Sequence, residues 1–217
     1  MINSNNRKLC LSGWLQENHP TEFSSPLKLQ KFLFLYEGFS KIDGDEYDFS
    51  YLKGYERGPV FSQVWGDYTI EKPEFYEVSL VAYDCHHTIV NIPRAERCAF
   101  ITKVLSNEDL SELTHKTHIW SAQKDMILSK EPQVKLHEED FNADDVAIFR
   151  QLEFMFPDEL IARSHIEPIN GYYFVFDKSQ KDKITKEHKN ILVNLTKEDL
   201  HNPVYVEIDN EGRLIVD

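Results

Sequence analysis

Hydrophobic positions in the N-terminal two thirds of the chain recur mostly at the spacing of α-helices. The clearest case is residues 25–40, SPLKLQKFLFLYEGFS, which begin with Ser25 as a good N-cap and Pro26 at the first helical position. Apolar side chains then occupy most of the circumference: Leu27, Leu29, Phe32, Leu33, Phe34, Leu35, Tyr36 and Phe39. Because a helix that is apolar on most sides needs neighbours on most sides, we expect it to be the central helix of the fold.

The same periodicity predicts further helices around this one, at residues 5–17, 93–105, from Glu108 onward, 117–130 and 142–156. Several of them carry end signals. Ser106 and Asp109 form a pair that resembles a capping box, and Asn142 precedes a first turn that holds Asp144 and Asp145. Pro132 and Pro157 are expected to end the last two helices.

Other segments point to strands and turns. Residues 41–60 contain turn residues at 43–45 and an alternation that predicts a short strand pair. Residues 57–59, Arg-Gly-Pro, predict a tight turn that leads into a helix with Pro59 at its first position. Residues 75–92 fit a helix and a strand equally well.

The pattern changes after Pro157. A strand is predicted at 171–178, a helix at 183–195, another cap between Thr196 and Asp199, and a hairpin at 204–217 that turns at 209–212. We therefore expect a mainly α domain with a small β-hairpin over residues 1–158, and a small α+β C-terminal extension over residues 159–217.

Composition narrows the class of protein. The chain has 217 residues and a net charge of −13, which disfavours nucleic acid and anionic membranes as partners and favours basic proteins. Three widely spaced cysteines predict no disulfide framework. No apolar run approaches the ~20 residues of a membrane span, and the N-terminal segment lacks the features of a signal peptide. These features together predict a cytoplasmic protein without a membrane partner.

Candidate chemistry is sparse. Cys85, His86 and His87 with Cys98 match no common zinc spacing, and His115 and His118 lack the pattern of a helical metal pair. The acidic runs at 138–140 and 144–145 are explained by solvation and helix capping. No nucleophile elbow, phosphate-binding loop or dinucleotide motif is present. We expect no catalytic residue, metal or cofactor.

Two polar or aromatic features stand out in apolar surroundings. Lys28 and Lys31 lie one turn apart on the predicted central helix. Because a lysine stem can follow apolar neighbours while its ammonium stays in water, we expect both at the exposed edge of that helix. Val60, Phe61, Val64, Trp65 and Tyr68 form an aromatic-rich face, on which Trp65 or Tyr68 is a candidate exposed anchor for a partner.

Three segments in order, LKLQKFLFLYEGF, GYERGPVFSQVW and LSELTHKTHIWSAQKD, resemble the Panacea domain, also called the SocA-like or GepA-like domain. In that family a helix of the form L-x-L-Q-K-L-L-x-x-x-x-G precedes a short strand with a Y-G-P-V-type turn, and a later helix carries L-S-x-x-x-H before a tryptophan. The chain matches at Leu27, Leu29, Gln30, Lys31, Leu33, Gly38, Gly58, Pro59, Val60, Leu110, Ser111, His115 and Trp120. LHEEDFNADDVAIF is similar to the closing helix of the family, so the resemblance covers residues 6–155. Arg57 stands where the family usually has an aromatic residue.

The resemblance implies an antitoxin of a bacterial or phage toxin–antitoxin pair that neutralises its toxin by direct binding. The expected partner is a cognate toxin encoded next door; one branch of the family is an adaptor that delivers its toxin to an AAA+ protease. The alternatives are a proteolytic adaptor or phage counter-defence protein that binds a host protein and, third, an enzyme that uses His115 or the acidic runs. The hypothetical partner-binding residues are Lys28, Gln30, Lys31, Arg57, Gly58, Pro59, Val60, Trp65, His115 and Trp120. The β-rich extension is a candidate for the partner-specific part, through strand addition at an exposed edge.

Overall fold

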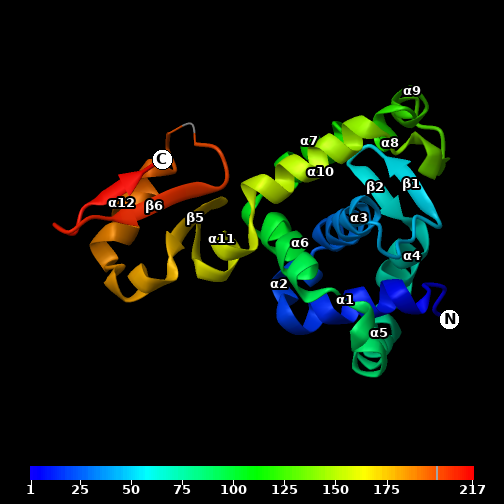
Figure 1. Ribbon diagram of the computed structural model, residues 1–217, viewed down its shortest axis with the longest axis horizontal. Coiled ribbons are helices and arrows are strands. Elements are labelled where there is room, and N and C mark those ends of the chain that lie inside the picture. Colours follow the sequence, from blue (N-terminus) through cyan, green and yellow to red (C-terminus); the bar gives the residue numbers. More distant parts are fainter. Residues whose placement is uncertain (199) are drawn as a thin grey trace.

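The computed structural model describes residues 1–198 and 200–217. Figure 1 shows a helical body built from the N-terminal part of the chain and a smaller α+β extension beside it, joined through the end of α10 and α11. The fold is mainly α with small β elements, as the sequence predicts. Asp199, the last residue of the predicted cap at 196–199, lies outside the described residues.

Helix α3 (Pro26–Asp43) is the central element of the helical body. Its N-cap is Ser25, whose side chain accepts from Lys28 N, and it ends at Gly44 in the left-handed conformation with φ 75°. Its residues from Leu29 to Ser40 are all buried. The helices packed on it include α1 (Asn6–Asn18), α2 (Pro20–Phe23), α6 (Ile92–Val104) and α10 (Ala143–Met155). The predicted central helix is confirmed.

Residues 75–92, for which the sequence leaves helix and strand open, fold mainly as α5 (Lys72–His86), followed by the 3-10 turn η1 (His87–Ile89). Phe75, Ser79 and Ala82 form its buried stripe. α5 packs closely on α1 because Gly13 lets the two backbones approach: a Cβ at Gly13 would clash with the carbonyl of Ser79.

A three-stranded antiparallel sheet of order β2-β1-β3 lies at one end of α3. It consists of β1 (Leu52–Tyr55), β2 (Gly58–Phe61) and β3 (Val134–Lys135). The predicted strand pair is confirmed, but Pro59 does not start a helix. It pairs with Gly54 inside β2, and α4 (Ser62–Ile70) begins three residues later. Pairing with β1 therefore holds this proline in extended backbone, which proline tolerates at the edge of a sheet.

The predicted helix at 117–130 is broken into two short helices, α8 (His118–Ser121) and α9 (Lys124–Leu128), after α7 (Asn107–His115). Each short helix turns its own apolar residue toward the small sheet. Trp120 donates its indole N–H to Tyr55 O at 3.0 Å, and Ile127 packs over Gly54, where a Cβ would clash with it. The chain then continues through β3 and the 3-10 turn η2 (Glu138–Asp140) to α10.

The capping signals of α7 and α10 are confirmed. Ser106 and Asp109 form a reciprocal capping box, and Asn142 and Asp145 form a second one. Asp145 is fully buried and also accepts the backbone N–H of His118 at 2.8 Å. Part of the acidic run at 144–145 is therefore structural.

The extension comprises α11 (Asp158–Arg163), β4 (Ser164–Ile169), β5 (Tyr172–Asp177), the 3-10 turn η3 (Lys178–Lys183), α12 (Lys186–Leu195), β6 (Val204–Ile208) and β7 (Leu214–Val216). Its sheet has the order β4-β5-β6-β7, in which only the β5–β6 pair is parallel. The predicted strand, helix and hairpin are confirmed, whereas α11 and β4 were not predicted. The β4–β5 turn at Asn170-Gly171, a typical hairpin dipeptide, is the signal that would have indicated β4.

The extension has a small core of its own, made of Phe174, Phe176, Leu192, Val204, Val206 and Ile208. It also contacts the helical body, since Val175 belongs to the larger core and Tyr173 packs against it. Within residues 1–198 and 200–217, no helix has both the length and the apolar character needed to cross a membrane.

Candidate functional site

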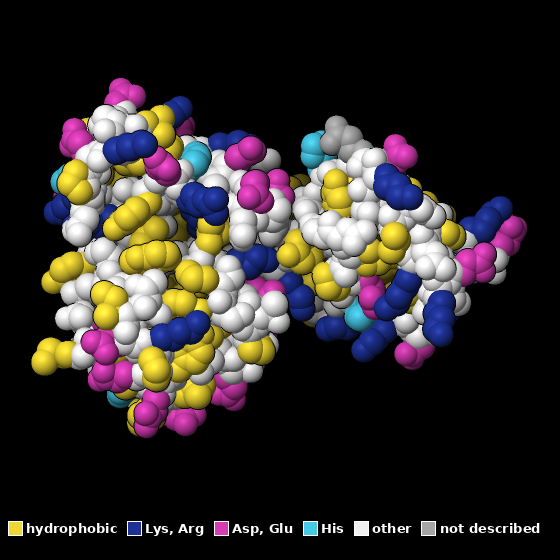
Figure 2. Space-filling model, turned by 180° about the vertical axis from the view of Figure 1, so that it is seen from behind, with side chains coloured by type: hydrophobic (Ala, Val, Ile, Leu, Met, Phe, Trp, Pro, Cys, Tyr) yellow, Lys and Arg dark blue, Asp and Glu magenta, His cyan; other side chains and the backbone are white. Residues whose placement is uncertain are grey.

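A groove of about 600 Å³ opens between the start of α3, the β1–β2 turn, β2, α4 and the start of α7. On the face shown in Figure 2, hydrophobic side chains gather over the helical body with Lys and Arg side chains among them. The residues that line the groove are Ser25, Pro26, Leu27, Gln30, Lys31, Tyr55, Glu56, Arg57, Pro59, Val60, Trp65 and Asn107. The groove therefore combines an apolar wall with a few polar groups, as is usual for binding sites.

Lys31 lies at the floor of this groove and joins three elements that are distant in sequence. Its side chain projects from α3, and the ammonium donates to the backbone carbonyl of Arg57 in the β1–β2 turn. It also donates to Thr114 Oγ1 of α7 at 2.7 Å. The expectation that Lys31 lies at an exposed edge is wrong, since only 1% of the residue is accessible to solvent. The β1–β2 turn and α7 lie between its ammonium and the solvent.

Lys31 differs from the other buried cations of the described chain in having no carboxylate beside it. Lys8 lies 2.5 Å from Glu37, Arg94 contacts two aspartates, and Arg97 lies 2.7 Å from Asp158. No carboxylate of residues 1–198 or 200–217 lies within 4 Å of the Lys31 ammonium. A buried charge without a counter-ion is unfavourable for folding, because neutral acceptors replace its hydration only in part.

The pKa values of the site reflect this arrangement. Burial lowers the pKa of the Lys31 ammonium from 10.5 to about 7. His115, the residue after Thr114, has a lowered pKa because it is partly buried and lies near the Lys31 charge. Near neutral pH the charge on Lys31 is therefore sensitive to its surroundings, and an anion bound close by would favour the protonated form.

The edge of β2 beside the groove is closed to strand pairing. Gln30 accepts the backbone N–H of Phe61 on its side-chain oxygen at 2.8 Å, and Pro59 has no N–H to offer. A partner strand cannot form a regular ladder on such an edge. A partner in the groove must therefore be recognised through side chains, which include the amides of Gln30 and Asn107.

Gly58 is required at the centre of the site for two reasons. Its φ of 107° lies in a region that side-chain-bearing residues rarely adopt, and a Cβ there would clash with the Lys31 ammonium and with Thr114 Oγ1. The absence of a side chain at this position therefore makes room for the buried ammonium.

Replacing Gly58 by alanine is expected to lower the free energy of unfolding by about 1–3 kcal/mol, the usual cost of a strained backbone residue. Gly66 in α4 is a matched control, because a methyl group added there would meet no neighbouring side chain or strand within 4 Å. Alanine in the interior of a helix stabilises the protein relative to glycine by about 0.5–1 kcal/mol. Urea denaturation measures the free energy of unfolding of the Gly58→Ala and Gly66→Ala variants. A Gly58→Ala protein as stable as the wild type would contradict the assignment.

Six of the predicted partner-binding residues line the groove: Gln30, Lys31, Arg57, Pro59, Val60 and Trp65. Trp65 is 40% exposed and remains a candidate anchor, whereas Tyr68 is buried and donates its hydroxyl to Ser24 O at 2.9 Å. Tyr68 therefore belongs to the core.

Four other predicted residues do not line the groove, and one of them, Gly58, is buried at the start of β2 beside the Lys31 ammonium. Lys28 points toward the extension, where its ammonium lies 5.1 Å from the centre of the Tyr173 ring and 3.4 Å from the Tyr173 hydroxyl. His115 stacks on Trp120 with ring centres 3.9 Å apart, and Trp120 is buried. His115 and Trp120 therefore support the groove from behind, and Lys28 contributes to the junction with the extension.

Sequence reasoning missed six residues that line the groove and also Thr114, which accepts from Lys31: the six are Ser25, Pro26, Leu27, Tyr55, Glu56 and Asn107. Tyr55 and Glu56 directly precede Arg57 in the segment GYERGPVFSQVW and could have been included from it. Asn107 and Thr114 carry no sequence signal of their own. Asn107 Oδ1 is buried and has no hydrogen-bond partner among the described residues. It is a polar atom at the groove that a ligand can satisfy.

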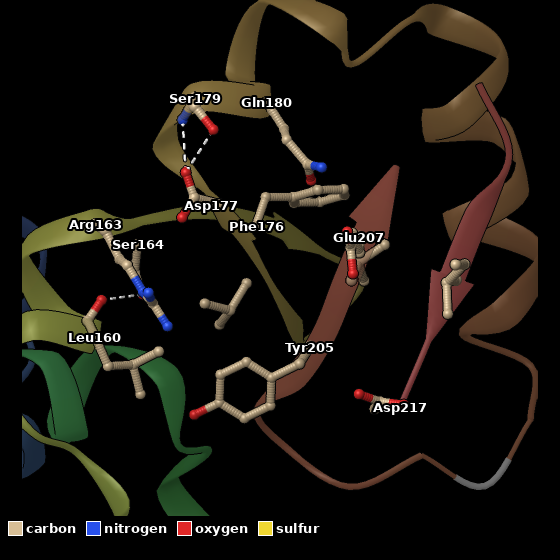
Figure 3. A pocket seen from close by; sticks show the side chains of 13 residues that line it. Leu160, Arg163, Ser164, Phe176, Asp177, Ser179, Gln180, Tyr205, Glu207 and Asp217 are labelled. Atoms are coloured by element: carbon tan, nitrogen blue, oxygen red, sulfur yellow. Dashed lines mark hydrogen bonds between the residues drawn. The ribbon is translucent and has the colours of Figure 1, made fainter. Parts of the chain in front are cut away.

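A second hollow of about 460 Å³ lies in the extension, over β5 and β6 and beside α11 (Figure 3). Some of its polar side chains are paired with their own neighbours. Asp177 accepts from Ser179 N and Oγ at 2.9 and 2.7 Å, and Gln180 exchanges two hydrogen bonds with the backbone of Ile208. Among the described residues, no side-chain atom that lines this hollow is both buried and without a hydrogen-bond partner, whereas Asn107 Oδ1 at the groove is.

The histidines, cysteines and acidic runs lie apart. Cys85 is exposed whereas Cys98 is buried, and His118 Nδ1 lies 2.8 Å from Asp140 O, away from the His115–Trp120 stack. Glu138 pairs with Lys41 at 2.9 Å. In residues 1–198 and 200–217, no group of three or more His, Cys, Asp or Glu side chains is arranged to hold a metal ion.

Comparison with known proteins adds no relative: no family model matches the chain, and neither a curated protein nor a solved structure matches it.

Proposed function

We propose that this protein is a Panacea-like antitoxin that neutralises a partner toxin by direct contact through the groove at Lys31. The proposal is supported by the way in which the three motif segments meet. Lys31 from the first is hydrogen-bonded to Arg57 of the second and to Thr114 of the third. Trp120 of the third segment donates to Tyr55 of the second at 3.0 Å.

The form of the groove also favours a protein partner. Its wall is mostly apolar, it carries the 40% exposed Trp65 at its rim, and its polar groups include two side-chain amides. Exposed tryptophan beside arginine is typical of residues that contribute strongly to protein interfaces. The net charge of −13 would also speed association with a basic partner.

The primary test is growth of cells that express the adjacent gene, with and without this protein. Toxicity that this protein relieves is the expected result. The same assay in cells that lack AAA+ proteases separates direct neutralisation, which persists, from an adaptor role, which is lost. A harmless neighbour would contradict the antitoxin role and favour the counter-defence alternative.

Trp65→Ala is expected to weaken partner binding by ~2 kcal/mol or more, the scale of an interface hot spot, and thereby to reduce rescue. The matched control is Phe154→Ala, since Phe154 on α10 is an aromatic residue that is 85% exposed and does not line the groove. Affinity for the purified partner and circular dichroism of each variant are measured together. An affinity of Trp65→Ala equal to that of the wild type would contradict the groove as the contact surface.

A further inference from the structure

The groove at Lys31 is unusual for its charge in an acidic protein. The chain carries 37 acidic and 24 basic side chains, yet neither Lys31 nor Arg57 has a carboxylate within 4 Å among the described residues. Glu56 is the one acidic residue in the groove lining, and it is exposed. Two cations at one groove therefore remain free of ion pairs.

The start of α3 adds to the positive potential. The N-cap Ser25 and the first helical residues Pro26 and Leu27 line the groove, and the first turn of α3 holds no acidic residue. Asn107 at the start of α7 also lines the groove, but the acidic residues Glu108 and Asp109 already compensate that helix end. Helix N-termini present the positive ends of their dipoles and attract anions. Together with the buried ammonium below and the Arg57 guanidinium at the rim, the start of α3 favours a negatively charged group in the groove.

Asn107 narrows the kind of ligand. Its Oδ1 is a buried acceptor without a donor among the described residues, and an N–H group of a ligand would satisfy it. A polypeptide provides both an N–H group and a negative charge, through its backbone amides and a carboxylate side chain, whereas a phosphate group carries no N–H. The apolar wall of Pro26, Leu27, Val60 and Trp65 suits the hydrophobic neighbours of such a carboxylate.

We propose that the groove binds an aspartate or glutamate side chain of an extended segment of the partner, with its carboxylate beside Arg57 and above Lys31. This inference rests on the proposed function and specifies its recognition chemistry. The overall negative field attracts a basic partner, and the groove then selects one acidic side chain on it. Because Lys31 has no counter-ion among residues 1–198 and 200–217, the partner supplies the charge that folding leaves uncompensated.

The test uses the purified chain and two blocked peptides, acetyl-Leu-Glu-Leu-amide and acetyl-Leu-Gln-Leu-amide, which differ in charge but hardly in shape. Binding is followed by the indole N–H resonance of Trp65, identified with Trp65→Phe. The glutamate peptide is expected to bind at least about tenfold more tightly, as one charge-assisted hydrogen bond permits. A preference below about threefold would overturn the proposal.

Two variants test the assigned cations separately. Lys31→Met and Arg57→Gln are each expected to remove most of the preference for the glutamate peptide, and Arg57→Gln keeps the test decisive should Lys31→Met not fold. Arg163→Gln, which removes an exposed arginine of the extension, is the matched control and should leave the preference unchanged. Two competitors complete the test: inorganic phosphate, and acetyl-Leu-Gln-Leu with a free C-terminal carboxylate. If either binds more tightly than the glutamate peptide, the proposal is also overturned.

The peptide experiment and the growth assay fail independently. Rescue by this protein without a glutamate preference would leave the antitoxin function in place and remove the acidic-side-chain inference. A glutamate preference without rescue would support the groove as a carboxylate site and contradict the antitoxin function.

Discussion

The stability of this protein is expected to increase by about 4 kcal/mol between pH 7 and pH 10 through the titration of Lys31 alone. The pKa of Lys31 is about 7 in the folded protein and 10.5 in the unfolded chain. Between these values the unfolded state binds the additional proton, so raising the pH favours folding. Below pH 7 the lysine is charged in both states and the penalty of burying it is fully present.

Lys31→Met isolates this effect, because methionine is similar in length and cannot be protonated. The variant should be more stable than the wild type at pH 6–7, and the difference should shrink steadily toward pH 10. His115, which lies near Lys31, also has a lowered pKa. Its contribution to the pH dependence ends near its ordinary pKa of 6.5, so the change between pH 7 and pH 10 reports Lys31.

Urea denaturation at unit steps of pH from 6 to 10 measures the difference. Lys116→Met, which removes an exposed lysine at the end of α7, serves as the control and should run parallel to the wild type. Parallel curves for Lys31→Met and the wild type would show that Lys31 is not a buried, uncompensated charge. A gain in stability together with a loss of partner binding would show that the lysine is kept for binding at a cost in folding.

Glu37→Gln is expected to destabilise the protein by about 3–5 kcal/mol, the usual loss when one partner of a buried ion pair is removed. The Glu37 carboxylate is fully buried and accepts from Arg7 at 2.9 Å and from Lys8 at 2.5 Å. It also accepts the backbone N–H of Asp48 at 3.1 Å. Without its charge, Lys8 keeps one carboxylate neighbour among the described residues, Asp48 at 3.5 Å.

The control is the same substitution in a more exposed ion pair. Glu138 pairs with Lys41 and its side chain is 48% exposed, so Glu138→Gln should cost at most about 1 kcal/mol. In a Lys8→Met, Glu37→Gln double variant, part of the stability should return, because the unpaired buried lysine is gone. Similar losses from Glu37→Gln and Glu138→Gln would show that the buried network does not support the helical body.

Local signals along the chain were sufficient for many of the elements. The Ser25-Pro26 start and nearly continuous apolar surface of α3 predicted its place at the centre. The capping pair at 106–109 and the N-cap Asn142 predicted the starts of α7 and α10. These features depend on residues within one or two helical turns, so they can be read without the rest of the fold.

Elements that depend on distant pairing were predicted less well. Pro59 has the local features of a helix start but lies in a strand, because β1 pairs with β2 through Gly54 and Lys53. The helix expected at 117–130 is broken because Trp120 and Ile127 each pack on the small sheet, and Tyr55, the partner of Trp120, lies 65 residues away along the chain. Tertiary contacts outweigh helical propensity at both places.

The sequence by itself determined the central helix, the capped helices, the small hairpin and the motif segments that resemble a Panacea domain. Only the tertiary structure decided the environment of Lys31. The groups that enclose its ammonium lie 26 and 83 residues away along the chain, and no local pattern reports whether such segments leave a path to water. The groove and its uncompensated charge are therefore properties of the folded chain.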